Sequence, residues 1–241
     1  MRGHEGDHVT GECLVREGPK DKNNKVHYTC ENFPVYKRLF YYEGEVYKSC
    51  NAALEQNNLL RGSYFIDVDR KPILVECERQ GKETQISISH DSFGIWHHLN
   101  NVAGTYTGDI NYEQDLNGII KLLDRSQRCR QLVKVKCYNS MLSRAYSWLR
   151  NRDRQKMTYW AGGPPDGKGC ACGINASCAS TSWLCNCDKN DNVLRSDDGY
   201  VTRKSDLPLT SFSTQDVDGT GEYKDIYIGK VECWTSKFSN R

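Results

Sequence analysis

The chain has 241 residues, of which 33 are Lys or Arg and 31 are Asp or Glu, giving a net charge of +2. This balance argues against a general nucleic-acid binder, and no apolar run reaches the roughly 18 residues of a membrane-spanning helix. Hydrophobic residues make up only 37% of the chain, which contains 12 cysteines. We therefore expect a secreted or extracellular protein in which disulfides compensate for a thin core.

Residues 1–45 are expected to form a small N-terminal appendage, separate from a main domain over 46–241. Cys13 and Cys30 are the only cysteines of the appendage, so we expect them to pair with each other, with an intermolecular bridge as the alternative. The segment His4–His8 matches the H-E-x-x-H zincin motif, but a glycine lies inside it and no apolar periodicity surrounds it. Because that motif works only on a helix, we expect a tail without protease activity.

The main domain is predicted to open with a helix and a hairpin. The helix covers Ser49–Leu60, and the strands cover Tyr64–Val68 and Ile73–Cys77 around the turn signal D-R-K-P. A disulfide between Cys50 and Cys77 would tie the helix to the second strand of the hairpin.

Further along, apolar periodicity predicts three strands and a long helix. Gln85–His90, Leu132–Cys137 and Asp225–Cys233 have strand patterns, the last with a glycine bulge at Gly229. Glu113–Gln127 has the spacing of an amphipathic helix. The pair Cys129–Cys137 brackets the second strand, and we expect these two cysteines to form a disulfide. Helices mixed with mainly antiparallel strands predict an α+β fold.

The most unusual stretch is Tyr159–Asp188, called here the cysteine block. It places two C-x-C pairs on either side of a lone cysteine, among residues that form turns. Zinc sites usually use C-x₂₋₄-C pairs, so the spacing favours a disulfide knot over a metal site. We expect four of its cysteines to pair among themselves and the fifth to pair with Cys233. The five cysteines are Cys170, Cys172, Cys178, Cys185 and Cys187.

The cysteine block also contains the sequence Asn175-Ala176-Ser177. This triplet is an N-glycosylation sequon, so Asn175 is a candidate glycosylation site on a surface loop.

A basic run precedes the cysteine block and is the first candidate binding site. Its cations are Arg150, Arg152, Arg154 and Lys156. Such a run is suited to a sulfated glycan or an acidic protein surface. The alternative is a solvated hairpin tip, because an aspartate interrupts the run.

A candidate calcium loop lies near the end of the chain. Asp216, Asp218 and Glu222 offer carboxylates on a segment with two glycines, which is how loops for hard cations are built. Calcium is the one cofactor that the sequence indicates, and a plain acidic turn is the alternative.

No catalytic constellation is visible in the sequence. His90, His97 and His98 lie close together, but no carboxylate is placed to orient them. Every cysteine can be assigned to a disulfide, which leaves no reactive thiolate. We expect that the protein is not an enzyme.

Several motifs resemble one family in order and spacing over about Val46–Trp234. They are SYFIDVD (Ser63–Asp69), ISISHD (Ile86–Asp91), the cysteine block with its Y-W-x-G-G, C-x-C-G-I and C-N-C-D sequences, D-L-P (Asp206–Pro208) and D-x-D (Asp216–Asp218). Together they resemble the fibrinogen-like region of the contactin-associated proteins, a group of neurexin-type adhesion receptors. The resemblance implies a disulfide-rich fibrinogen-like fold with a mixed, mainly antiparallel sheet and short helices, and it favours the Cys50–Cys77 pair.

The resemblance also leads to two expectations for function. The first is an extracellular protein-interaction module in adhesion or matrix assembly, and the second is a secreted calcium-dependent lectin of the same fold. The partner would be an extracellular protein in the first case and a glycan in the second. On the first reading, binding survives chelation and falls when Arg150, Arg152 and Arg154 are replaced together by serine.

Overall fold

The computed structural model describes residues 45–143, 146–165, 167–179 and 182–236, preceded by the backbone of three short strands. These strands are β1 (Leu14–Glu17), β2 (His27–Glu31) and β3 (Tyr42–Glu43), and they form an antiparallel sheet of their own. Cys13 and the segment His4–His8 lie outside the described residues. The Cys13–Cys30 disulfide and the division of the chain at residue 45 therefore stay predictions.

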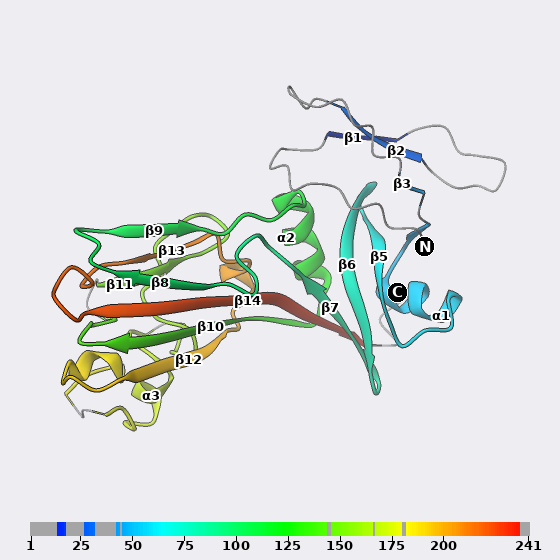
Figure 1. The fold of residues 1–241 in the computed structure, drawn as a ribbon. Coiled ribbons are helices and arrows are strands. Elements are labelled where there is room, and N and C mark those ends of the chain that lie inside the picture. The colour runs from blue at the N-terminus through cyan, green and yellow to red at the C-terminus, as the bar shows by residue number, and fades with distance from the viewer. Residues whose placement is uncertain are drawn as a thin grey trace.

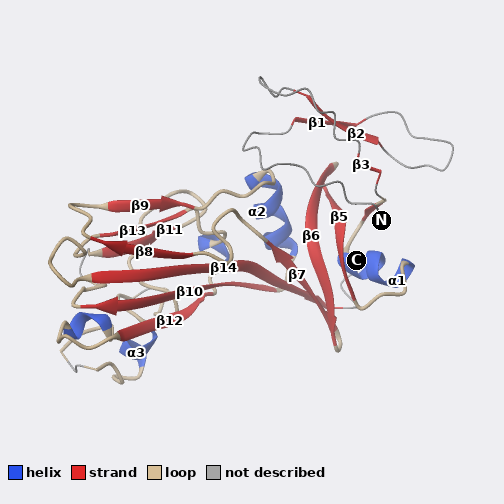
Figure 2. Cartoon of the chain, viewed as in Figure 1, coloured by secondary structure: helices blue, strands red, loops and turns tan. Residues whose placement is uncertain are grey.

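The rest of the described chain is organised around one large sheet of eight strands (Figures 1 and 2). Its order is β12-β10-β14-β7-β6-β5-β4, and β8 pairs with β14 outside this path. All pairs are antiparallel except that of β4 with β5. The strands are β4 (Val46–Tyr47), β5 (Arg61–Val68), β6 (Lys71–Gln80), β7 (Glu83–Ile88), β8 (Trp96–Asn100), β10 (Arg128–Tyr138), β12 (Arg195–Val201) and β14 (Tyr223–Ser236).

Strand β14 links the two halves of this sheet. One of its edges pairs with β10 along most of its length, while the other pairs first with β8 and then with β7. The register with β10 shifts between Gln131, opposite Val231, and Val133, opposite Ile228. The extra residue on β14 confirms the predicted bulge at Gly229 and adds local bend and twist to the strand.

A smaller antiparallel sheet of three strands completes the core. It has the order β11-β13-β9, from β9 (Tyr106–Asp109), β11 (Ser147–Arg150) and β13 (Ser211–Thr214). Phe212 and Leu149 are fully buried in the same apolar cluster as Val133 and Ile226 of the large sheet. The two sheets therefore share one core.

The helices are short, and the two longer ones begin with side-chain caps. In α1 (Cys50–Gln56), the Ser49 hydroxyl accepts a hydrogen bond from the Ala52 N–H. In α2 (Leu116–Arg125), the Asp115 carboxylate accepts one from the Gly118 N–H. Both predicted helices are present, each shorter than its pattern. Each begins directly after a residue whose side chain accepts from one free N–H group of the first turn. In the described part of the chain, no helix is long and apolar enough to cross a membrane.

Five disulfides hold the described residues, and the expected Cys129–Cys137 bridge is wrong. Both cysteines lie on β10, eight residues apart. A strand rises about 3.3 Å per residue, which separates them by about 26 Å, whereas bridged Cα atoms lie within about 7 Å. Cys233 consequently pairs across the ladder with Cys129, and does not join the cysteine block. The disulfides are Cys50–Cys77, Cys129–Cys233, Cys137–Cys187, Cys170–Cys185 and Cys172–Cys178.

The cysteine block contains little regular structure and packs on β12. Its elements are the single-turn helix α3 (Ala171–Ile174) and the 3₁₀ turn η1 (Cys187–Lys189), and a second 3₁₀ turn, η2 (Lys204–Asp206), follows β12. A side chain at Gly199 of β12 would lie 2.5 Å from the Ala161 carbonyl oxygen. Glycine is therefore required where the block's backbone crosses the strand. The described fold is a disulfide-rich, mainly β structure with short helices.

Candidate interaction surface

The large sheet has one buried face and one that carries polar and aromatic side chains. On β10, Val133 and Val135 are fully buried, while Lys134 and Lys136, which alternate with them, point to the opposite side. This alternation follows from the two-residue period of a strand. We call the second side of β8, β10, β12 and β14 the outer face.

Cross-strand register arranges the outer face in rows. Trp96 of β8 lies opposite Tyr227 of β14, which lies opposite Lys134 of β10, which lies opposite Asp198 of β12. Directly opposed residues of antiparallel strands share a face and contact each other. The next row contains His98, Asp225, Lys136 and Ser196. The outer face is therefore a continuous surface that draws on four strands.

Cations and aromatic rings alternate on this surface. The Arg130 guanidinium carbon lies 4.2 Å from the ring centre of Tyr200 and 4.8 Å from that of Trp234. Lys136 lies 4.8 Å from the Trp96 ring centre, and Lys230 lies 4.7 Å from the Phe93 ring centre. Contacts of this kind stabilise both partners and hold the side chains in place.

Several of these cations also form ion pairs. Arg130 bonds Glu232 at 2.7 Å and Lys230 bonds Glu76 at 2.8 Å. Arg128 bonds both carboxylate oxygens of Glu83, and its hydrogen bonds hold the pKa of Glu83 below the ordinary value. Lys134 and Lys136 have no carboxylate partner among the residues that the structure describes.

A tight loop, Asp91–Ile95, leads into β8 at the edge of the outer face. The Asp91 carboxylate accepts hydrogen bonds from the Asn111 N–H at 3.0 Å, the Asn111 side-chain amide at 2.8 Å and the Ser92 hydroxyl at 3.0 Å. Burial raises the pKa of Asp91, but these hydrogen bonds outweigh it and leave the pKa lowered. The loop is thus fixed at its first residue. The sequence patterns did not predict the outer face as a whole, because it depends on which strands are neighbours.

The predicted basic run is divided by the structure. Arg154 is exposed at a turn, and Lys156 lies 3.9 Å from the ring centre of Trp148. Arg150 donates to the Arg154 carbonyl at 2.9 Å. The Arg152 side chain is only 10% exposed and bonds two backbone carbonyls and Asp124. Arg152 therefore has a structural role, while Arg150, Arg154 and Lys156 stay close together at the turn.

The candidate calcium loop does not gather its three carboxylates. Asp216 accepts from the Met141 N–H at 2.6 Å, Glu222 accepts from the Gly219 N–H at 2.7 Å, and Asp218 is exposed. Within the described residues, the single group with metal-ligand spacing is Cys170, Cys185 and Asp197. Its two cysteines form a disulfide with each other, so they offer no thiolate to a metal.

A buried lysine lies near this loop and was not anticipated. Lys224 is fully buried, and its ammonium donates to Thr214, Ser147 and the Gln215 carbonyl, at 2.9, 3.2 and 2.6 Å. Burial lowers its pKa to about 7, against the opposing effect of Asp216, Asp188 and Glu222. An amino group from the chain itself therefore lies near these carboxylates, and the strand pattern of the sequence does not reveal it.

The histidines occupy separate environments. His90 is buried, and its Nε2 lies 3.0 Å from the Gly229 carbonyl oxygen. Burial lowers the pKa of His90 and of His97. His98 is exposed and bonds Asp225 at 2.6 Å. Each of the ten cysteines from Cys50 to Cys233 is in a disulfide.

The sequon residue Asn175 is exposed at the end of α3. It lies inside the short loop that Cys172–Cys178 closes, so an acceptor side chain is presented on a constrained turn.

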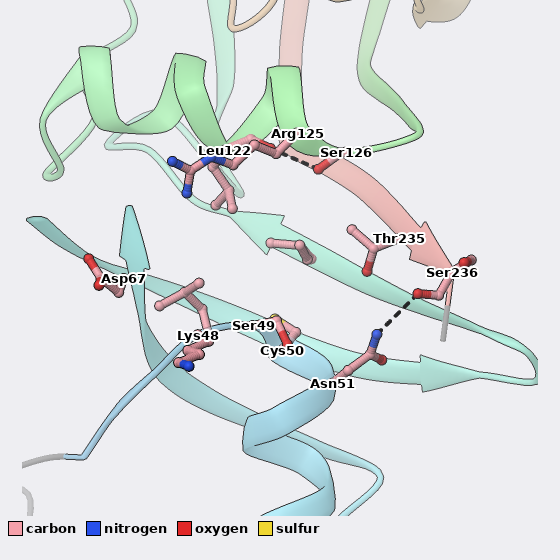
Figure 3. Close-up of a pocket in the computed structure, with 12 residues that line it drawn as sticks. Lys48, Ser49, Cys50, Asn51, Asp67, Leu122, Arg125, Ser126, Thr235 and Ser236 are labelled. Atoms are coloured by element: carbon pink, nitrogen blue, oxygen red, sulfur yellow. Dashed lines mark hydrogen bonds between the residues drawn. The ribbon is translucent and has the colours of Figure 1, made fainter. Parts of the chain in front are cut away.

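A small pocket lies between α1, the end of α2 and the end of β14 (Figure 3). Several of its polar groups bond each other or nearby backbone. The Asn51 side chain donates to the Ser236 carbonyl at 3.2 Å, and Ser126 donates to that of Leu122 at 2.9 Å. Asp67 accepts from the Arg70 N–H at 2.7 Å. The described lining residues include no nucleophile paired with a base.

Comparison with known proteins finds similarity to a contactin-associated protein over nearly the whole chain. No family model matches. Contactin-associated protein 1 from Homo sapiens, Mus musculus and Rattus norvegicus is 26% identical to this chain over 239 residues, covering 91% of the chain. The chain spans 17% of the length of these curated relatives. This similarity supports a domain of the contactin-associated type.

Proposed function

We propose that this chain is an extracellular protein-interaction module of fibrinogen-like type, acting in cell adhesion or matrix assembly without catalysis. The observation that carries the proposal is the outer face, where aromatic rings and cations from four strands form one surface. Protein interfaces are enriched in Tyr, Trp and Arg, and residues of these types supply most of their binding energy.

The disulfides support the extracellular location. Five bridges among the described residues require an oxidising compartment to form and persist. Similarity to part of an adhesion-type protein is in line with that location.

The absence of catalysis is part of the same proposal. His90 is engaged by a backbone carbonyl and His98 by Asp225. A nucleophile and its base must lie within hydrogen-bond reach of each other, and neither contact provides such a pair.

The name of these relatives, contactin-associated protein 1, states an association with contactin. We propose a contactin-type ectodomain as the first partner to test. The matching region is a fraction of each relative, so the panel should also contain other cell-surface ectodomains.

The test is binding of the immobilised, folded chain to that panel, with calcium or with EDTA, beside a glycan array under the same conditions. We expect saturable binding of an ectodomain with an unchanged Kd in EDTA, since a protein interface of this kind needs no ion. Glycan binding that EDTA abolishes, and that Asp218→Ala also removes, would instead identify the lectin. Failure of every ectodomain to bind would contradict the proposed function.

A further inference from the structure

Three large apolar side chains are exposed together at the edge of the outer face. Phe93 is 39% exposed, Ile95 is 50% exposed and Trp96 is 41% exposed. Single exposed apolar residues are normal on a protein surface, but a contiguous group marks an interaction site. Here three fall within four positions of the chain.

The backbone that carries these side chains is held firmly. Phe93 N–H donates to the His90 carbonyl at 3.1 Å, and Ile95 N–H donates to that of Ser92 at 3.3 Å. Gly94 between them has a φ of +84°, which a residue with a side chain rarely adopts. Together with the three bonds to Asp91, these contacts fix the loop before a partner arrives, which lowers the entropic cost of binding.

Tyr227 joins the exposed aromatic residues into a cluster. Its ring centre lies 5.3 Å from that of Trp96 and 6.4 Å from that of Phe93. Lys136 and Lys230 lie at the outer sides of the cluster, on the Trp96 and Phe93 rings respectively. The result is an apolar centre with a cationic rim.

The rim selects a negatively charged partner. Lys230 is already paired with Glu76, but Lys134 and Lys136 form no ion pair within the described chain. Asp198 and Asp225 lie opposite them in the rows, and Asp225 is paired with His98. The aliphatic Ile95 favours a protein over a sulfated glycan, because a sugar ring stacks on aromatic faces while an exposed branched alkyl group is best covered by apolar side chains.

We propose that Phe93, Ile95, Trp96 and Tyr227 form the anchor site for an apolar protein segment flanked by carboxylates, which pair with Lys134 and Lys136. This inference rests on the proposed function and deepens it, since it names the site and the chemistry of the partner. Such an interface usually has aromatic and aliphatic anchors in its centre and charged pairs at its rim.

The first experiment needs no knowledge of the natural partner. A library of random 12-residue peptides displayed on phage is selected against the folded chain, and each peptide is measured on the wild type and on the double variant Phe93→Ser, Ile95→Ser. We expect peptides with apolar residues next to Asp or Glu, which bind the double variant about tenfold or more weakly. Charge reversal by Lys134→Glu and Lys136→Glu should weaken the same peptides, more so at low salt.

Matched controls come from exposed leucines elsewhere. Leu60 is 71% exposed and Leu194 is 55% exposed, so Leu60→Ser and Leu194→Ser remove similar apolar area away from the cluster. These variants should bind the selected peptides like the wild type. Thermal unfolding of each variant confirms that the fold is retained.

The second arm uses the ectodomain that binds in the panel. The selected peptide should compete with it, and Trp96→Ser should weaken it. An ectodomain that binds all variants equally would overturn this inference and leave the proposed function standing. Selection that yields no peptide sensitive to Phe93 and Ile95 would also overturn it. Two further results would overturn the inference. One is self-association of the chain that is lost in the double variant, and the other is binding to anionic lipid vesicles in place of peptides.

Discussion

The cysteine block and the outer face of the large sheet are built by opposite means. The block consists of turns and single-turn helices, and three disulfides, Cys137–Cys187, Cys170–Cys185 and Cys172–Cys178, restrain it. The outer face is held by ladder hydrogen bonds and by the buried side chains on the other side of the same strands. Covalent links thus supplement the few core residues that the block supplies, such as Tyr159, Trp160 and Ala161, while the proposed binding surface lies on a sheet with a large core behind it.

Removing disulfides one at a time should have the largest effects on the free energy of unfolding. These effects should differ between the large sheet and the cysteine block. In the loop-entropy model, the Cys129–Cys233 bridge over 104 residues contributes about 4.7 kcal/mol. The Cys172–Cys178 bridge over 6 residues contributes about 2 kcal/mol in the same model. We therefore expect Cys129→Ala with Cys233→Ala to lower the free energy of unfolding more than Cys172→Ala with Cys178→Ala.

Urea unfolding of both double variants, at fixed pH and without reductant, measures this difference. Equal losses in the two would contradict the assignment of the long bridge to the sheet. The shorter bridge is the better target for testing whether the block takes part in binding, because its loss should leave the sheet folded.

Lys224 of β14 interacts electrostatically with Asp188 at the end of the cysteine block. Its titration therefore tests how the block is joined to the sheet. Its pKa is lowered to about 7, so between pH 7 and pH 10 the unfolded chain binds a proton that the folded chain has released. The free energy of unfolding then rises with pH in this window, by at most about 1.4 kcal/mol per pH unit.

Urea unfolding of the wild type and of Lys224→Met at pH 7, 8 and 9 isolates this contribution. The variant should lack this rise in the free energy of unfolding, because it lacks the lysine and shares every other titrating group with the wild type. A wild-type curve parallel to that of the variant would show that Lys224 keeps its ordinary pKa.

Substitutions in the basic run are expected to change the free energy of unfolding least. They also allow a buried and an exposed arginine of the same run to be compared. Arg152→Ser removes the donors to Leu207, Lys204 and Asp124, so we expect a loss of about 1–3 kcal/mol in the free energy of unfolding. Arg154→Ser changes an exposed turn residue and should stay within about 0.5 kcal/mol of the wild type.

Thermal unfolding of the two single variants distinguishes these cases. Because Arg152 has a structural role, replacing Arg150, Arg152 and Arg154 together is a poor test of binding. A loss of binding in the triple variant would follow from a damaged fold. The pair Arg154→Ser and Lys156→Ser is the better test of the exposed charges.

Patterns within one element were predictable from the sequence, and contacts between distant elements were not. The α2 helix, the β5–β6 hairpin and the bulge at Gly229 each follow from local spacing or turn chemistry. The polar, glycine-containing β12 gave no strand signal, although it pairs with β10 along seven residues. The Cys129–Cys137 error has the same origin, because nearness in sequence does not bring two residues of one strand together.

The candidate site shows the same limit. The alternation of Lys134 and Lys136 with buried valines was visible, but the neighbours of these lysines depend on β8, β12 and β14 meeting β10. The basic run and the Asp216 loop were chosen for composition alone, and composition does not show that Arg152 is buried or that Asp216 and Glu222 bond nearby backbone.

The most direct test of the central claim is hydrogen–deuterium exchange or carbene footprinting of the chain with and without its bound ectodomain. Protection confined to residues 91–96, 130–136 and 223–230 is the result that we predict, since these segments contain the outer face and its aromatic loop. Protection that falls instead on the cysteine block at 159–188, with the outer face unchanged, would contradict the account.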